Sequence, residues 1–348
     1  MFAIKRYGRS VVLCILLGLW ALTTAAPATA PALPLSCPDF PPVLSLQLVA
    51  IYTDTRQSVP DAAAEKKNSD LTAGVDQFLR SIEQAIDRPD VHRGDPAADC
   101  AFENFKKWAI AGALTVEPKP YNRDGTVKRG EYLIGLNVLA LKFKAAGFTL
   151  DPTVITWLRT LNHENMDFYE KASNRGNLRI WAGTAAALFA LVQPDAQALD
   201  FQNRVWREAM TAIHDDGMID AELARGQRAL IYHMFSFSAT LMLRDAREAL
   251  GYRNSPSDTA KVKSLANMIG RTLCDPQMLA GPARAKQEIP GDWGYRVPIG
   301  FGADLLDENW SRCGRAHVSL SDPTSGGDTQ HAAAILKQWA QATARPVP

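Results

Sequence analysis

The chain has 348 residues, of which 47% are hydrophobic and 22% are charged, with 38 Lys and Arg against 37 Asp and Glu. This length and apolar content suffice for a large packed core, and they exclude a disordered chain, a collagen-like chain and a small disulfide scaffold. Because the charges almost balance, the sequence lacks the basic excess that is typical of a nucleic-acid-binding protein. We therefore predict no nucleic-acid partner.

The first 28 residues have the pattern of a secretory signal peptide. Three basic residues lie between positions 5 and 9, residues 11–22 form an apolar run, and alanines follow as cleavage candidates. The run is shorter than a membrane span, and no later stretch reaches 18 apolar residues. We expect a signal peptide at 1–28, a single domain at 29–348 in the periplasm, and no membrane contact after cleavage.

Four cysteines remain after the predicted cleavage: Cys37, Cys100, Cys274 and Cys313. An even number in an oxidising compartment indicates two disulfides, for which three connectivities are possible. We prefer pairing in chain order, Cys37 with Cys100 and Cys274 with Cys313. No closely spaced Cys or His pair has metal-ligand spacing, so we predict no metal.

Apolar residues recur at helical spacing almost everywhere in the mature chain. With Gly and Pro between the segments, this spacing predicts about ten helices, including 69–87, 96–114, 126–147, 152–169, 178–193, 198–214, 221–250, 257–273 and 328–344. Short turns favour antiparallel helix pairs. The predicted fold class is all-α. Such pairs can curve into an (α/α) toroid around a central groove, while a bundle or a globin-like arrangement stays open.

Residues 275–315 break this pattern, because they hold four prolines and six glycines. We expect a long and mostly irregular segment here. Loops of that length within a compact domain are usually functional or disordered.

The clearest chemical signal begins at Arg225. Tyr232 follows seven residues later, so on a helix the two side chains point the same way to within about 20°, with Arg228 between them. Two guanidinium groups beside a phenol suit the binding of a carboxylate next to a proton-transfer group. Nearby positive charge favours the phenolate, so we expect a lowered pKa for Tyr232. The structural alternative is a solvent-exposed face or an ion pair with a nearby acid.

This segment resembles the signature helix of the family 5 polysaccharide lyases, the alginate lyases. The matching residues are Arg225, Gln227, Arg228, Ala229, Leu230, Tyr232 and His233, preceded by Glu222 and Leu223. Further similarity lies near 51–54, 100–109 and 326–328. The resemblance covers most of the mature chain and implies an incomplete (α/α) toroid.

The resemblance implies β-elimination on an anionic, uronate-containing polysaccharide without a metal or cofactor. Tyr232 would take the C5 proton and return a proton to the glycosidic oxygen, while Arg225 and Asn177 would neutralise the uronate carboxylate. Positive charge, including Lys128 and Arg129, would gather in the groove. Further substrate contacts are expected from Arg228, Arg179, Tyr52, Trp181 and His233.

Several of these expected contacts have a structural alternative. His233 can be a core histidine whose ring nitrogens are both hydrogen-bonded, and Trp181 can be a core aromatic. Tyr52 lies where the family has a mobile lid over the groove, and the polar stretch up to Asp70 can be that lid or a plain surface loop.

Three positions depart from the family pattern. Leu178 stands where the family has a catalytic histidine, Gly226 replaces the second signature arginine, and Phe235 replaces a tyrosine. Arg179 or another cation takes over the histidine's role, or the substrate is a different uronate polymer, or the chain is a non-catalytic relative that binds polysaccharide. We expect a monomer, and contact with an exopolysaccharide export machinery is open.

A cluster of acids supports a different class of enzyme, a glycoside hydrolase, which needs two carboxylates on either side of the bond it cleaves. The cluster consists of Asp215, Asp216, Asp220 and Glu222. Helix caps and first-turn charges explain the same four residues more simply.

Overall fold

The computed structural model describes residues 37–88, 90–171, 176–315 and 318–343. The expected signal peptide at 1–28 lies outside these residues. The described residues belong to a compact unit that begins at Cys37. None of their helices is long and apolar enough to cross a membrane.

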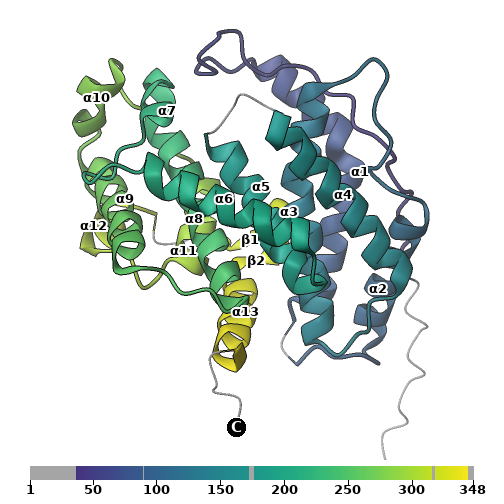
Figure 1. Ribbon diagram of the computed structural model, residues 1–348. Coiled ribbons are helices and arrows are strands. Elements are labelled where there is room, and N and C mark those ends of the chain that lie inside the picture. The colour runs from purple at the N-terminus through teal and green to yellow at the C-terminus, as the bar shows by residue number, and fades with distance from the viewer. Residues whose placement is uncertain (1–36, 89, 172–175, 316–317, 344–348) are drawn as a thin grey trace, which may run out of the picture. The chain divides into compact units, whose positions relative to one another are not determined.

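The described residues fold almost entirely into helices, which confirms the predicted all-α class (Figure 1). Strand structure among them is limited to one antiparallel hairpin, β1 (Ser321–Asp322) with β2 (Gly327–Asp328). The α-helices are α1 (Ala62–Ile86), α2 (Pro96–Ile110), α3 (Arg123–Ala145), α4 (Pro152–Lys171), α5 (Asn177–Val192), α6 (Ala196–Ala212), α7 (Asp220–Leu223), α8 (Ala229–Ala249), α9 (Pro256–Cys274), α10 (Gln277–Ala283), α11 (Trp293–Phe301), α12 (Glu308–Cys313) and α13 (Thr329–Thr343). Two 3-10 turns complete them, η1 (Gly226–Arg228) and η2 (Pro323–Ser325).

Helix α1 begins earlier than the sequence predicted. Asp61 caps it by accepting hydrogen bonds from the backbone N–H groups of Ala63 and Ala64, and such a cap contributes about 1 kcal/mol. The polar stretch before Asp70 is therefore helical from Ala62 onward. The expectation of a lid or loop is wrong for these residues.

The segment 275–315 is also more regular than predicted. It contains α10, α11 and α12, which are short helices, and two of them include a proline, Pro282 and Pro298. Between them the chain turns back repeatedly, as its glycines and prolines predict. This segment packs against α8 and α9, and α10 also contacts η1.

Two disulfides are present, and both pair in chain order as preferred. Cys37 joins Cys100 with the Cα atoms 5.5 Å apart. Cys274 joins Cys313 with a Cα separation of 5.0 Å and closes the segment that holds α10 to α12. On the chain-entropy model each crosslink stabilises the fold by about 3–4 kcal/mol.

Helices α5 and α8 lie at the centre of the packing. In Figure 1, α5 lies between α1–α4 on one side and α7–α12 on the other. α5 packs against α3, α4, α6 and α8, and α8 packs in addition against α9, α11 and α13. Gly183 allows the close approach of α6, because a Cβ at this position would lie 2.5 Å from a methyl group of Val205. Both central helices are buried around most of their circumference, so they give a rigid base to the residues at their N-terminal ends.

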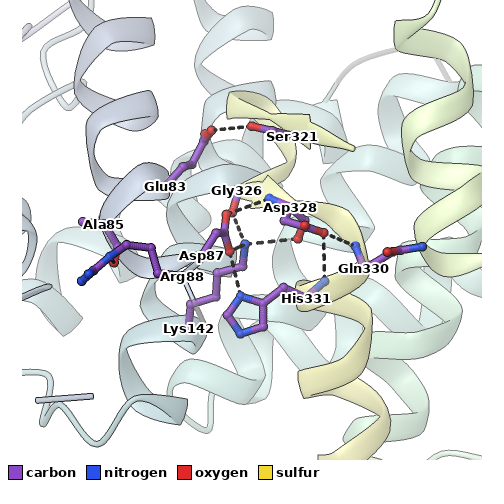
Figure 2. Close-up of polar contacts among 10 residues, drawn as sticks. All are labelled: Glu83, Ala85, Asp87, Arg88, Lys142, Ser321, Gly326, Asp328, Gln330 and His331. Carbon is purple, nitrogen blue, oxygen red and sulfur yellow. Dashed lines mark hydrogen bonds and ion pairs between the residues drawn. The ribbon is translucent and has the colours of Figure 1, made fainter. Parts of the chain in front are cut away.

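A buried polar cluster ties the C-terminal hairpin to the helices (Figure 2). The Nζ of Lys142, a fully buried side chain on α3, donates to Asp87 and to the carbonyl oxygens of Gly326 (2.6 Å) and Asp328 (3.2 Å). Asp87, just after α1, also accepts from the backbone N–H of Asp328 and lies 2.8 Å from Nδ1 of His331 on α13. The cluster thus connects α1, α3 and α13 and fixes the hairpin between them.

Candidate active site

A cavity of about 520 Å³ lies where the N-terminal segment, α1, α3, α5, the turn before α8 and η2 meet. Among its lining residues are Tyr52, Gln57, Lys128, Asn177, Leu178, Trp181, Arg225, Tyr232 and Phe235. A larger cavity, of about 640 Å³, lies at the opposite end of α8 and contains none of the predicted site residues. The smaller cavity is therefore the candidate active site.

The signature segment is not the continuous helix that we predicted over 221–250. α7 ends at Leu223, η1 follows, and α8 begins at Ala229. Gly226 has a φ of 58°, in the left-handed region that favours glycine. The glycine that stands in place of the second signature arginine thus permits the break, and the argument from helical spacing is wrong.

The turn nevertheless brings the predicted groups together. The guanidinium carbon of Arg225 lies 4.5 Å from the centroid of the Tyr232 ring, and that of Arg228 lies 6.0 Å from it. Gln287 fastens the turn, since its side-chain amide donates to the carbonyl of Gly226 and accepts from the N–H of Leu230, both at 3.0 Å. Two cations therefore face one phenol across a short, braced turn.

The Tyr232 hydroxyl lies in a small network. It is 2.9 Å from the hydroxyl of Tyr52 and 3.3 Å from the backbone oxygen of Gln57, while Arg228 donates to the Tyr52 hydroxyl at 3.1 Å. Burial and the neighbouring Tyr52 raise the pKa of Tyr232 more than Arg225 and Arg228 lower it. The expected lowering of this pKa is therefore wrong for the structure as it stands.

Residues 51–60, here called the lid segment, cover the tyrosine. Arg225 donates to the side-chain oxygen of Gln57 at 2.6 Å and to the carbonyl of Arg56 at 3.3 Å. Asp54 stiffens the segment by accepting from the N–H groups of Ser58 and Val59, both at 2.8 Å. The side-chain oxygen of Gln57 thus accepts the hydrogen bond from Arg225 that we predicted for a uronate carboxylate. The sequence held no signal for this role of Gln57.

Asn177 begins α5 and is oriented by a buried acid. Its backbone N–H donates to Glu222 at 3.1 Å, and its side-chain Nδ2 lies 3.3 Å from both oxygens of the same carboxylate. The Ser236 hydroxyl donates to Glu222 at 2.7 Å. Burial raises the pKa of Glu222 above its usual value. The hydrogen bonds from Ser236 and Asn177 and the charge of Arg225 act in the opposite direction but do not cancel this effect. Sequence reasoning missed this orienting role, although Glu222 lies only three residues before the signature arginine.

Apolar side chains cover part of the cavity wall. Leu178, at the position of the family histidine, and Trp181, one turn further along α5, both line the cavity and are partly buried. Phe235 lines it from α8, and its ring lies 5.9 Å from that of Tyr232. The predicted placement of Trp181 at the groove agrees with this geometry.

Arg179 does not lie at the cavity. Its Nε donates to Glu208 on α6 at 2.6 Å, its Nη1 donates to the carbonyl of Tyr169, and its exposed fraction is 4%. Because α5 turns this side chain away from Leu178, Arg179 cannot take over the role of the family histidine. The expectation that it contacts substrate is wrong.

His233 is a core histidine. It is fully buried, its Nδ1 donates to the carbonyl of Ala229 at 2.7 Å, and its Nε2 accepts from the N–H of Ile219 at 3.0 Å. Burial lowers the pKa of His233 to about 4, so the ring is neutral near pH 7. The structural alternative holds for this residue, and the expected substrate contact is wrong.

The positive charge of the groove is smaller than expected. Lys128 lines the cavity, paired with Glu131 at 2.8 Å, whereas Arg129 pairs with Glu164 and is not a lining residue. Arg228 keeps one donor, Nε, without a hydrogen-bond partner among the described residues, 3.7 Å from the carboxylate of Glu288.

The acids that suggested a glycoside hydrolase do not meet at this cavity. Asp215 and Asp216 line a separate small pocket with Arg271, and Asp220 lies beside His214. Glu222 is held by Asn177 and Ser236 as described above. The paired carboxylates that this chemistry needs are therefore not supplied by these four residues.

Comparison with known proteins gives the family. The alginate lyase family model matches residues 90–277. A polysaccharide lyase of Stenotrophomonas maltophilia K279a is 26% identical over 248 residues, which is 69% of this chain and 74% of that protein. An alginate lyase of Pseudomonas syringae pv. syringae is 24% identical over 250 residues, 68% of this chain, and the match spans 65% of its length, just under two thirds.

Solved structures show the same fold. Alginate lyase A1-III, in a variant with a histidine replaced by alanine and complexed with a tetrasaccharide, superposes with a TM-score of 0.69 at 18% identity, covering 91% of this chain and 89% of that one. The structure of alginate lyase A1-III from Sphingomonas species A1 gives a TM-score of 0.66 at 17% identity, covering 85% of each chain. This likeness confirms the predicted (α/α) toroid. Since the family model covers more than half of the sequence, the chain belongs to the alginate lyase family.

Proposed function

We propose that this chain is a polysaccharide lyase that cleaves a uronate-containing polymer by β-elimination. The observation that carries the proposal is the convergence of Arg225, Tyr232 and Asn177 at one cavity. The named relatives are a polysaccharide lyase and alginate lyases, which supports a substrate of the same chemical class. An anionic polymer would be the partner of this cavity.

In the proposed reaction, Arg225 and Asn177 bind the uronate carboxylate. Neutralising that charge makes the proton on C5 more acidic, because the electrons left on C5 delocalise into the carboxylate group. Tyr232 as phenolate takes the C5 proton, the C4–O4 bond breaks, and a double bond forms between C4 and C5. The same phenol then gives its proton to O4 of the leaving sugar, so protons and electrons balance without a cofactor.

The lid segment must rearrange before this can happen. Gln57 holds the guanidinium that would bind the carboxylate, and Tyr52 holds the hydroxyl that would take the proton. Substrate would therefore replace Gln57 on Arg225. This exchange suits Arg chemistry, since a carboxylate forms a stronger, charge-assisted hydrogen bond than a neutral amide does.

Leu178, in place of the family histidine, affects both the proposed mechanism and the alternative of a non-catalytic binding protein. A leucine neither donates nor accepts a proton, so Tyr232 would carry out both proton transfers alone. The same substitution favours a second candidate function, a non-catalytic relative that binds polysaccharide. We also propose a periplasmic location after removal of residues 1–28, a location that the two disulfides support because they suit an oxidising compartment.

A product assay separates these functions. The purified protein would be incubated with polymannuronate, polyguluronate, polyglucuronate and hyaluronan, and the ultraviolet absorbance of unsaturated uronate followed over time. An increase with at least one polymer, absent in Tyr232→Phe, is the result we expect. New reducing ends without this absorbance would indicate a hydrolase. Retention on a polymer without any product would indicate a binding protein.

A further inference from the structure

Trp293 is an exposed aromatic residue beside the candidate site that the proposed reaction does not use. It begins α11, in the Pro- and Gly-rich segment, and its exposed fraction is 37%. Single exposed apolar residues are common on protein surfaces, but an aromatic that continues the wall of a cavity is a typical ligand contact.

Trp293 extends a row of aromatic rings that starts at the reacting tyrosine. Its ring stacks on Phe235, with centroids 4.8 Å apart and an angle of 21° between the planes. Phe235 in turn lines the cavity and lies 5.9 Å from Tyr232, whereas Trp293 is not a lining residue. The row thus runs from Tyr232 through Phe235 to a partly exposed indole, and Phe235 covers one face of that indole.

The segment that carries Trp293 is hydrogen-bonded to the turn before α8. The N–H of Glu288 donates to the carbonyl of Gln227 at 2.8 Å, next to the contacts of Gln287 described above. α11 packs against α8, and a Cβ on Gly294 would lie 2.9 Å from Pro290, which precedes α11. Trp293 is therefore held at a set place relative to Tyr232.

The acidic residue next to Trp293 in the sequence forms an ion pair. Asp292, the preceding residue, pairs with Arg315 at 2.5 Å, and both side chains are half exposed. The negative charge nearest in sequence to the ring is thereby balanced. Asp292 therefore adds no unbalanced negative charge next to Trp293.

We propose that Trp293 forms a further sugar-binding subsite, in which a pyranose ring of the polymer stacks on the indole outside the cavity. This inference rests on the proposed function for the class of ligand. A cavity of about 520 Å³ holds only a few sugar units, so a polymer must continue beyond it. The apolar C–H face of a pyranose matches a flat aromatic surface, and stacking removes both from water.

The test compares chain lengths. Trp293→Ala should raise KM for a long polymer about tenfold, which corresponds to about 1.4 kcal/mol of binding, and leave kcat nearly unchanged. The change should be much smaller for the shortest oligosaccharide that is cleaved, because it does not reach the subsite. Trp293→Phe should keep most of the affinity. Ile289→Ala, which removes another exposed side chain of the same segment, is the control and should change nothing.

Affinity electrophoresis in gels that contain the polymer keeps this inference separate from the proposed reaction. If the wild-type protein makes no unsaturated product but is retarded, and Trp293→Ala is retarded less, the lyase proposal fails and the subsite stands. If the protein cleaves polymer and Trp293→Ala has the wild-type KM at every chain length, the subsite is refuted and the lyase stands. A protein that neither cleaves nor binds any of the polymers overturns both.

Discussion

Tyr232 can act as a base only if it loses its proton, and its neighbours act on that proton in opposite directions. Burial and the Tyr52 hydroxyl raise its pKa, while Arg225 and Arg228 lower it. The net effect in this structure is a raised pKa. Because the free phenol already titrates near pH 10, the phenolate is a minor species at neutral pH.

We expect the rate of elimination to rise with pH. Below the pKa of Tyr232, the phenolate fraction grows about tenfold per pH unit, so kcat/KM should rise steadily from about pH 6 to about pH 9. Tyr52→Phe removes a group that raises this pKa, so its profile should move to lower pH. A kcat/KM that is flat or falls over this range, measured by the initial rate of double-bond formation, would contradict a tyrosine base.

Gln57 competes with substrate in our account. Gln57→Ala removes the amide oxygen from Arg225, so the uronate carboxylate no longer has to displace it. We expect KM to fall by about threefold to tenfold, since a hydrogen bond to a charged group is lost only from the unbound state. Arg56→Ala is the matched control, because Arg225 contacts only the backbone carbonyl of that residue. A rise in KM for Gln57→Ala would mean that Gln57 itself binds substrate.

Sequence patterns did not predict where the side chains of Arg179 and His233 lie. Arg179 and His233 stand next to site residues in the sequence, yet one pairs with Glu208 and the other lies in the core. α5 and α8 are buried around most of their circumference, so hydrophobic periodicity cannot say which face meets the cavity. The resemblance pointed to Arg225, Tyr232 and Asn177 from residue types at fixed positions rather than from periodicity, and these three residues line one cavity.

At the scale of elements, apolar spacing and punctuation predicted most of the helices, while their ends depend on caps. The cap at Asp61 makes α1 begin at Ala62, before the predicted start at residue 69. Gly226 interrupts the segment that we predicted as one long helix over 221–250. A glycine inside an apolar pattern is compatible with an unbroken helix, so its positive φ could not be foreseen. The short helices of 275–315 were missed because prolines and glycines obscure their period.

The turn at Gly226 should tolerate no side chain without cost. Gly226→Ala places a Cβ in the left-handed region, which costs about 1–2 kcal/mol of stability, and any relaxation of the turn moves Arg225. Gly147→Ala is the matched control, because its φ is 86°, open space surrounds it and it does not line the cavity. Both variants should lose similar stability in urea titrations, while only Gly226→Ala should lose activity. Equal activities would show that the turn does not position Arg225.

At the scale of the whole unit, the buried cluster around Lys142 and Asp87 joins the first helix to the last (Figure 2). Removing one partner of a buried ion pair commonly costs about 3–5 kcal/mol. η2, whose Thr324 and Ser325 line the cavity, belongs to the same hairpin. The contacts that join α1, α3 and α13 thus also hold the hairpin whose turn lines the cavity.

Glu83, which accepts a hydrogen bond from Ser321 of the hairpin, makes the stability of the fold depend on pH. Burial raises the pKa of Glu83 to about 7, against the hydrogen bond from Ser321 and the charge of Lys142. Since the folded-state pKa is the higher one, the contribution of Glu83 is fully present below about pH 4.5 and is lost as pH rises through about 7.

The free energy of unfolding should therefore fall between about pH 5 and about pH 8, by about 1–3 kcal/mol. Glu83→Gln should remove most of this dependence, as followed by urea denaturation at each pH. Glu103→Gln, a change at an exposed acid on α2, should leave it in place. The same slope in Glu83→Gln as in the wild type would assign the pH dependence to another group.

The mass of the cleaved products distinguishes elimination from hydrolysis. Elimination leaves a new non-reducing end that is lighter by one water than the end left by hydrolysis, because a C4–C5 double bond replaces an added hydroxyl and hydrogen. We predict that the purified chain, incubated with a polyuronate, yields oligosaccharides of this lower mass, and that Tyr232→Phe yields none. Products with the mass of hydrolysis, or undiminished product from Tyr232→Phe, would contradict the account.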